Sequence, residues 1–157
     1  MMNTPVEKVQ RALDELGYDG KIIHSDATIF TVEDASKAIG VSQNEILKSL
    51  IFLVDDAPWL VLMAGGNRVH AGKVKRLAGG RRVTMAQPDL VFRRFGFKIG
   101  GVPPLGYTEA LPALLDEDLW NFPVVWAAAG TDHDFFPVAP DDLCRFTKGT
   151  RGSLKKE

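Results

Sequence analysis

Residues 49–65, SLIFLVDDAPWLVLMAG, decide the fold that this sequence predicts. The apolar runs at 49–54 and 59–65 are long enough for buried strands, and the DDAP between them is typical of a tight turn. Together they predict a β-hairpin inside a sheet. Lys48 stands immediately before the first run. A lysine at such a position either extends to solvent or points into a site at the end of the sheet.

Helical and strand patterns alternate irregularly on both sides of this hairpin. Apolar spacing, capping residues and N-terminal prolines predict helices over 6–16, 31–40, 42–47, 67–77 with Asn67 as its cap, 88–95 and from 140 onward. Further strands are predicted at 21–24, 81–86, 109–116, 123–130 and 135–138. This order predicts an α/β or α+β fold with a mixed, partly antiparallel central sheet flanked by helices. The phosphate-binding glycine motifs of nucleotide-binding folds are absent.

Length and composition indicate one ordinary globular domain over residues 1–157, with 45% hydrophobic and 25% charged residues. The Gly- and Lys-containing tail at 148–157 is expected to fray. Cys144 is the single cysteine, which excludes an internal disulfide and suits a reducing cytoplasm. Because no apolar run reaches the roughly 18 residues that span a bilayer, we expect a cytoplasmic protein without a membrane partner.

Charge is segregated along the chain although the net charge is only −1. Nine basic residues and one acid lie between residues 57 and 108, and eight acids with no Lys or Arg lie between 109 and 142. A basic half of this kind favours a polyanionic partner, because Lys and Arg release counterions from phosphates. A solvated helix face would produce the same pattern.

A rigid loop at residues 98–106, KIGGVPPLG, is the strongest candidate for a site. Gly100 and Gly101 let a ligand approach the main chain, while Pro103 and Pro104 stiffen the segment that follows. The alternative is a plain turn between two elements.

Other catalytic chemistry is poorly supported by the residues present. The three histidines have no metal-ligand spacing, the cluster 132–134 is more typical of a polar turn, and no GxSxG nucleophile motif occurs. We therefore predict neither metal nor cofactor. A lysine at a strand end and a backbone-exposing loop suit hydrolysis of an activated acyl bond, in which water is positioned and backbone donors meet the oxyanion.

Four stretches in order carry a resemblance to a known family. They are TVEDASKAIGV with EILKSLIF, the GxxxP pattern at Gly100–Pro104, LPALLDEDL, and AAAGTDHDFFPVAPDDL. This series, over roughly residues 20–147, resembles the YbaK/ProX-type aminoacyl-tRNA deacylases, which are related to the editing domain inserted in bacterial prolyl-tRNA synthetases.

The resemblance implies a freestanding, metal-independent hydrolase. It would cleave the ester of mischarged aminoacyl-tRNA, expected to be tRNA-Pro carrying a small non-cognate amino acid, with help from the terminal ribose 2′-hydroxyl. The implied partners are the tRNA acceptor end and prolyl-tRNA synthetase, for a monomer or a homodimer. A non-catalytic tRNA- or synthetase-binding module and a small-molecule acyl esterase are the alternatives.

The resemblance also implies roles for particular residues. Lys48 would contact the phosphate or ribose of the terminal adenosine, and backbone groups of Gly100 and Gly101 would serve the aminoacyl group and the attacking water. Further substrate-binding residues would be Phe30, Val102, Pro103, Pro104 and His133. Phe30, Ile51, Met63 and Val102 are candidates for the pocket that selects the amino acid, with a plain core role as the alternative.

Overall fold

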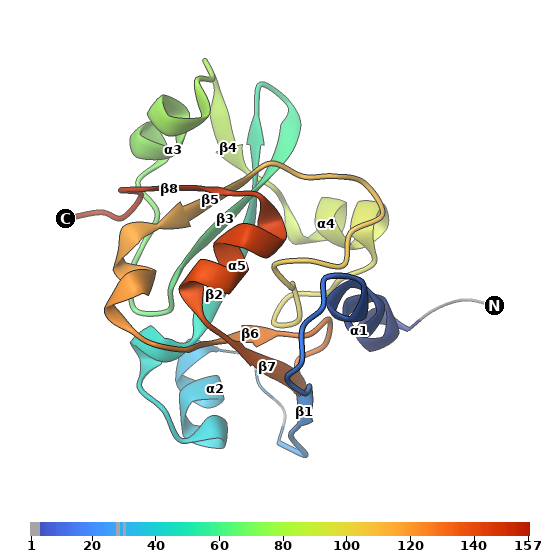
Figure 1. Cartoon of the computed structure of the whole chain (residues 1–157). Coiled ribbons are helices and arrows are strands. Elements are labelled where there is room, and N and C mark those ends of the chain that lie inside the picture. Colours follow the sequence, from blue (N-terminus) through green and yellow to red (C-terminus); the bar gives the residue numbers. More distant parts are fainter. Residues whose placement is uncertain (1–3, 28, 30) are drawn as a thin grey trace.

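The computed structural model describes residues 4–27, 29 and 31–157. The strands in this part of the chain form a five-stranded sheet and a three-stranded sheet (Figure 1). An isolated parallel bridge between Ile46 and Trp126 joins the two sheets. The cavity described below as the candidate site is lined by residues of both sheets.

The large sheet has the strand order β4-β2-β3-β5-β8. Its strands are β2 (Leu47–Val54), β3 (Ala57–Ala64), β4 (Val83–Met85), β5 (Ala113–Asp116) and β8 (Thr150–Gly152). The predicted hairpin is confirmed as β2 and β3, which pair in antiparallel fashion with Lys48 opposite Met63. β4 pairs antiparallel with β2, whereas the β3–β5 and β5–β8 pairs are parallel. The predicted mixed, partly antiparallel sheet is therefore confirmed.

The small sheet has the order β1-β7-β6 and is antiparallel throughout. Its strands are β1 (Ile23–His24), β6 (Val125–Ala128) and β7 (Asp134–Val138). The turn between β6 and β7, at residues 129–133, packs against the glycine/proline loop. This contact makes the small sheet part of the site's frame.

The helices begin where local capping predicts, with one exception. They are α1 (Pro5–Glu15), α2 (Val32–Ile39), α3 (Ala71–Ala78), α4 (Pro88–Phe95) and α5 (Pro140–Thr147), with 3-10 turns η1 (Gln43–Glu45) and η2 (Glu117–Asn121). The exception is α3, because its cap is His70, whose Nδ1 accepts the N–H of Lys73 at 3.1 Å. Asn67 was predicted as this cap, but its side chain is bonded to Asp118 and the chain stays extended up to His70.

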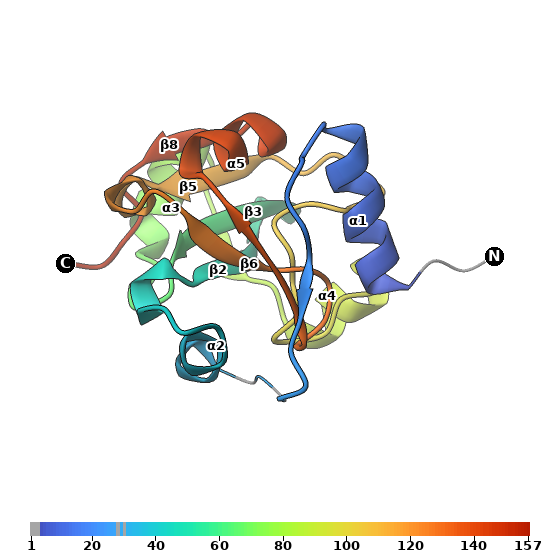
Figure 2. The same ribbon diagram turned by 60° about the horizontal axis from the view of Figure 1, so that its bottom comes forward.

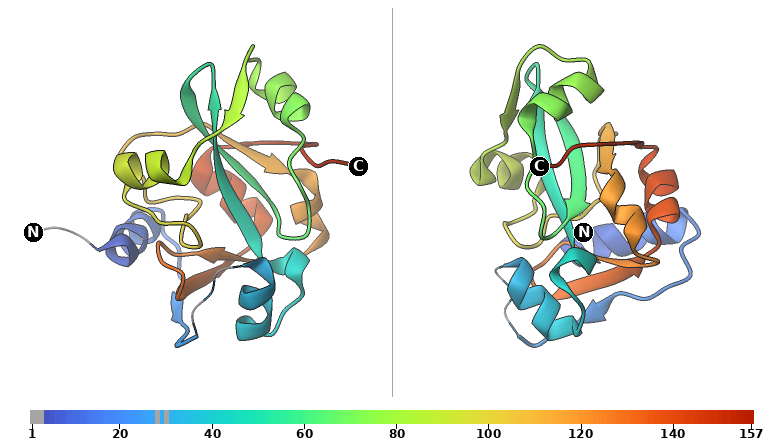
Figure 3. Two further views of the ribbon diagram at one scale, coloured as in Figure 1. Left: turned by 180° about the vertical axis from the view of Figure 1, so that it is seen from behind. Right: turned by 90° about the vertical axis from the view of Figure 1, so that its left-hand side faces the viewer.

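Helices cover both faces of the large sheet. Apolar residues of α1, α4 and α5 pack on one face in the main core, and Val74 of α3 packs on the other face with Phe52 and Met63. Figure 2 shows α1 and α5 at one side of the strands and α2 at the opposite side. Figure 3 shows α3 beside β4, near the turn of the β2–β3 hairpin.

The C-terminal segment is folded into the sheet, so the expectation of a frayed tail at 148–157 is wrong. Residues 150–152 form β8, and Leu154 is 0% exposed in the core beneath α3. The backbone N–H of Leu154 donates to the Asp116 carboxylate at 2.8 Å. A buried leucine and a satisfied buried carboxylate hold the segment in place despite its polar composition.

Candidate active site

A cavity of about 280 Å³ opens between the start of β2, α2, the end of β4, α4 and the glycine/proline loop. Its wall is mainly apolar and includes Ile29, Val32, Ala35, Ile46, Leu47, Ile51, Ala86, Val91, Phe97, Val102 and Phe135. Ile99 is 74% exposed and Met85 is 54% exposed, and both contribute to the lining. An apolar cavity with apolar residues still open to solvent is the usual form of a small-molecule site.

Ser49 brings a polar group to this apolar wall. Its hydroxyl is buried, and none of the described residues is its hydrogen-bond partner. A buried hydroxyl without a partner costs free energy, so it is uncommon unless the position has another use.

Lys48 lies at the edge of the cavity, and its ammonium is held in place. Its Nζ donates to the backbone carbonyl of Asn67, in the segment between β3 and α3. Because Lys48 stands opposite Met63, its side chain leaves the sheet on the face away from Ser49 and Ile51. The ammonium is therefore directed at Asn67, beside the apolar cavity.

Electrostatics make this edge positive. Burial lowers the pKa of Lys48 below its ordinary value, and the nearby Arg68 guanidinium lowers it further. Two cations close enough to repel one another form a ready site for an anion such as a phosphate.

The glycine/proline loop borders the cavity with its main chain. Gly100 has φ +86°, a conformation that favours glycine. At Gly101 a Cβ atom would lie 2.7 Å from Thr131 Cα, so only glycine fits against the β6–β7 turn. The N–H of Gly101 donates to the Lys98 carbonyl at 3.0 Å, which closes the turn. Its N–H is thus engaged within the loop.

The two prolines of the loop are not part of the cavity lining. Pro103 and Pro104 are buried, and the Pro103 carbonyl accepts the Tyr107 hydroxyl at 2.7 Å. Burial raises the pKa of Tyr107, so this hydroxyl stays protonated as a donor. The arrangement fixes the loop and leaves Val102 at the wall.

His133 lies in the β6–β7 turn, away from the cavity lining. Its Nδ1 is 2.9 Å from the Ser25 carbonyl oxygen, and its ring stacks on His24 at 5.8 Å between centroids. His24 Nδ1 in turn lies 2.8 Å from Asp134 Oδ1. These contacts hold the turn that supports Gly101.

The predicted residues are thus divided between the cavity and its support. Lys48, Gly100, Val102 and Ile51 line the cavity, whereas Gly101, Pro103, Pro104 and His133 do not. Met63 is fully buried beneath α3, on the opposite face, and belongs to the core. Phe30 lies outside the described residues.

Sequence reasoning missed several contributors. Arg68 was counted only within the basic half, and Ile99 and Met85 were not singled out although their exposure marks the cavity's entrance. The position of Ile99 directly before a glycine pair could have marked it as a residue of the cavity's entrance.

Metal ligands do not gather in the structure. Nowhere in the described part of the chain do three His, Cys, Asp or Glu side chains come together in a group that could hold a metal ion. None of the helices within residues 4–27, 29 and 31–157 combines the length and apolar character needed to cross a bilayer.

Comparison with known proteins identifies the family. The model of the aminoacyl-tRNA editing domain matches residues 26–146, which include the whole cavity edge from α2 to β7. The chain belongs to the aminoacyl-tRNA editing domain family. The resemblance noted in the sequence is thereby confirmed. The general function of this domain is aminoacyl-tRNA editing.

Individual relatives agree with this assignment. A crystal structure of a candidate trans-editing enzyme for prolyl-tRNA synthetase matches with a TM-score of 0.91 and 38% identity over 100% of both chains. The uncharacterised protein YwhH of Bacillus subtilis is 28% identical over 142 residues, 90% of each chain.

Prolyl-tRNA synthetases contain a related segment. The proline–tRNA ligase of Thermosipho melanesiensis is 32% identical over 96 residues, which is 61% of this chain and 17% of the ligase. The similarity therefore concerns one part of the ligase.

Proposed function

We propose that this editing domain acts as a freestanding trans-editing hydrolase that cleaves the ester of mischarged aminoacyl-tRNA. The observation that carries the proposal is that Lys48 meets Gly100 and Val102, which lie more than 50 positions further along the chain, at one apolar cavity. The similarity over the full chain to a candidate trans-editing enzyme supports a freestanding role.

The size of the cavity favours a small amino acid. Its volume of about 280 Å³ lies just below the range for small-molecule pockets, which is roughly 300 to 1,000 Å³. The aminoacyl group would enter the cavity, while the terminal adenosine would remain at its entrance. Non-cognate amino acids smaller than the cognate proline suit this arrangement, with tRNA-Pro as the expected carrier.

The charge at the edge suits the terminal phosphate and ribose. Lys48 and Arg68 would bind these groups and so place the ester over the cavity. The main chain of Gly100 and Val102 would face the aminoacyl group and position the water. The ribose 2′-hydroxyl would assist the attack, so the protein would supply placement more than acid–base chemistry.

The basic half offers a docking surface for the acceptor stem. On α4, Arg93 and Arg94 are paired with Asp89 and Glu109. Around α3, by contrast, the exposed side chains of Arg68, Lys75 and Arg76 form no ion pair with any described residue. Together with Lys48 they would follow the phosphate backbone away from the cavity.

The test is deacylation of a tRNA panel charged with alanine, cysteine, serine, threonine and proline, in the presence of a chelator. Wild type is expected to hydrolyse one or two non-cognate species and to spare prolyl-tRNA. Lys48→Ala is expected to abolish this hydrolysis with an unchanged circular dichroism spectrum, whereas Lys21→Ala, at an exposed position, is the matched control. Salt-dependent tRNA binding without hydrolysis of any species would instead indicate a non-catalytic binding module.

A further inference from the structure

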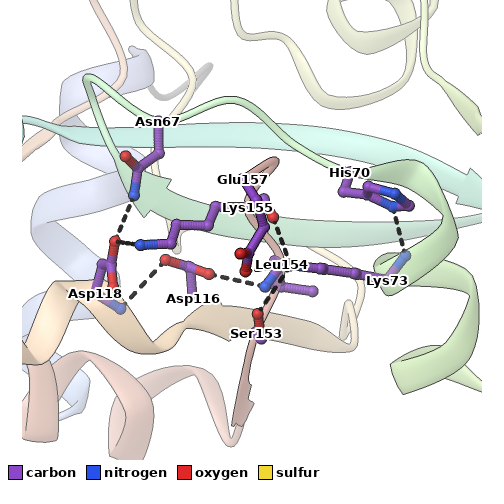
Figure 4. Close-up of polar contacts among 9 residues, drawn as sticks. All are labelled: Asn67, His70, Lys73, Asp116, Asp118, Ser153, Leu154, Lys155 and Glu157. Carbon is purple, nitrogen blue, oxygen red and sulfur yellow. Dashed lines mark hydrogen bonds and ion pairs between the residues drawn. The ribbon is translucent and has the colours of Figure 1, made fainter.

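The residues of the C-terminal segment meet the segment that holds Lys48. Lys155 Nζ donates to Asp118 Oδ2 at 2.6 Å, and the Asn67 side-chain amide donates to the same oxygen at 2.9 Å. Figure 4 shows Lys155 and Asn67 converging on the Asp118 carboxylate from different segments. Asn67 is also the residue whose backbone carbonyl accepts the Lys48 ammonium.

Backbone contacts strengthen this connection. Residues 67–70, the holding segment, run alongside residues 154–156: His70 N–H donates to the Leu154 carbonyl at 2.8 Å, and Lys156 N–H donates to the Arg68 carbonyl at 2.8 Å. Val69 and Lys155 form an antiparallel bridge. The holding segment therefore has the C-terminal segment as its neighbour along its whole length.

A buried carboxylate fixes the other end of the contact. Asp116, at the end of β5, is 0% exposed. One of its oxygens accepts the Leu154 N–H at 2.8 Å and the other accepts the Asp118 N–H at 3.2 Å. The positions of Asp118 and of the C-terminal segment are thus set by one side chain (Figure 4).

We propose that Asp118 and Lys155 are positioning residues for Lys48, because they fix the holding segment whose Asn67 carbonyl receives its ammonium. The proposal rests on the editing function proposed above and adds two residues to it. Neither side chain lines the cavity, so each acts through Asn67 and not on the substrate. The same segment carries Arg68, whose guanidinium is near enough to lower the pKa of Lys48.

The charge pair is suited to this task. Its side chains are 23% and 34% exposed, so solvent screens it less than a surface ion pair. The hydrogen bond from Lys155 lowers the pKa of Asp118, with the Asn67 amide as a further cause, so the carboxylate accepts both donors in its charged form. A small displacement of a reacting or binding group can reduce an enzymatic rate by about 100-fold per ångström.

The test compares Lys155→Ala with Lys156→Ala. Both variants remove one positive charge from the same end of the chain, but the Lys156 side chain is exposed and takes no part in the contacts, and alanine keeps its backbone N–H. We expect Lys155→Ala and Asp118→Ala to lower kcat/KM for deacylation about tenfold. Lys156→Ala is expected to stay within about twofold of wild type.

A double-mutant cycle separates positioning from general stability. Because Lys48→Ala is expected to abolish hydrolysis, the cycle is measured as the Kd for uncharged tRNA. If Lys155 acts through Lys48, adding Lys155→Ala to Lys48→Ala will not raise this Kd further. The proposal would be overturned if the effects of Lys155→Ala and Lys48→Ala multiplied in the double variant. Full activity of a folded Lys155→Ala protein would also overturn it.

A readout independent of activity keeps the two proposals distinguishable. The pKa of the Lys48 ammonium, followed by NMR of ¹⁵N-labelled lysine, is expected to rise toward its ordinary value in Lys155→Ala, because the freed side chain gains water. If wild type hydrolyses no tRNA but this shift occurs, the editing proposal fails and the positioning contact stands. An unchanged Lys48 pKa in a folded Lys155→Ala protein would refute the positioning contact whatever the activity.

Discussion

Replacement of Gly101 by alanine tests how tightly the glycine/proline loop is seated. The new Cβ would lie 2.7 Å from Thr131 Cα, 2.9 Å from the Gly130 carbonyl oxygen and 2.9 Å from the Thr131 carbonyl carbon. Non-bonded carbons prefer about 3.5 to 4.0 Å, so the two main chains must separate by close to an ångström. None of the three contacts involves a flexible side chain that could move aside.

The size of the effect follows from this displacement. Overpacking of this kind costs about 1 to 3 kcal/mol, which for a chain of this length lowers the melting temperature by roughly 2 to 12 °C. Because Gly100 and Val102 line the cavity on either side of Gly101, the same displacement would reduce deacylation by about 10- to 100-fold. The assay pairs differential scanning fluorimetry with single-turnover deacylation.

Gly79→Ala is the matched control. Gly79 has φ +73° at the end of α3, and nothing lies within 4 Å of its added Cβ, so the variant loses about 1 to 2 kcal/mol through backbone strain alone. We expect a similar fall in melting temperature with deacylation retained. If Gly101→Ala melted lower but deacylated at the wild-type rate, the loop would not belong to the active site.

Three further variants probe other parts of the structure. Ser49→Ala removes a buried hydroxyl that has no hydrogen-bond partner among the described residues, so the melting temperature should hold or rise. A fall of several degrees would reveal a partner. Leu154→Ala should cost about 2 to 5 kcal/mol in urea unfolding, and a loss below about 1 kcal/mol would mean that the segment is loosely packed. Because the folded pKa of Asp118 is depressed, its contribution is present above about pH 4 and lost as the pH falls through the folded value. The stability gap between wild type and Asp118→Asn should therefore narrow from pH 5 to pH 3, and a constant gap would contradict the ion pair.

Local patterns predicted much of the architecture. The β2–β3 hairpin follows from two apolar runs around a tight turn. α2 follows its cap Thr31, and α4 and α5 begin at Pro88 and Pro140, as their capping signals indicate. In each case the residues that decide the structure are close neighbours in the chain. For the same reason the sequence predicted that Lys48 lies near the start of a strand and that residues 98–106 form a loop.

Features that depend on distant partners were not predicted. Thr150–Gly152 has no apolar alternation and becomes a strand only because β5 offers it a parallel edge. Asp116 belongs to an acidic run that suggests solvent, yet it is fully buried because two backbone N–H groups satisfy it. The contact between Lys48 and Asn67 likewise depends on how residues 154–156 hold the segment, which no local pattern records.

The pairing of β1 with β7 has a consequence for the order in which the molecule folds. His24 and Asp134 are 110 residues apart, whereas the β2–β3 hairpin closes through a short turn. Pairing β1 with β7 closes a much longer stretch of chain than the hairpin does, and this costs more chain entropy. The hairpin bearing Lys48 is therefore expected to form early and the small sheet late. The β6–β7 turn that seats Gly101 belongs to the late sheet. The cavity would therefore be completed near the end of folding, and partly folded chains would carry the lysine without the loop beside it.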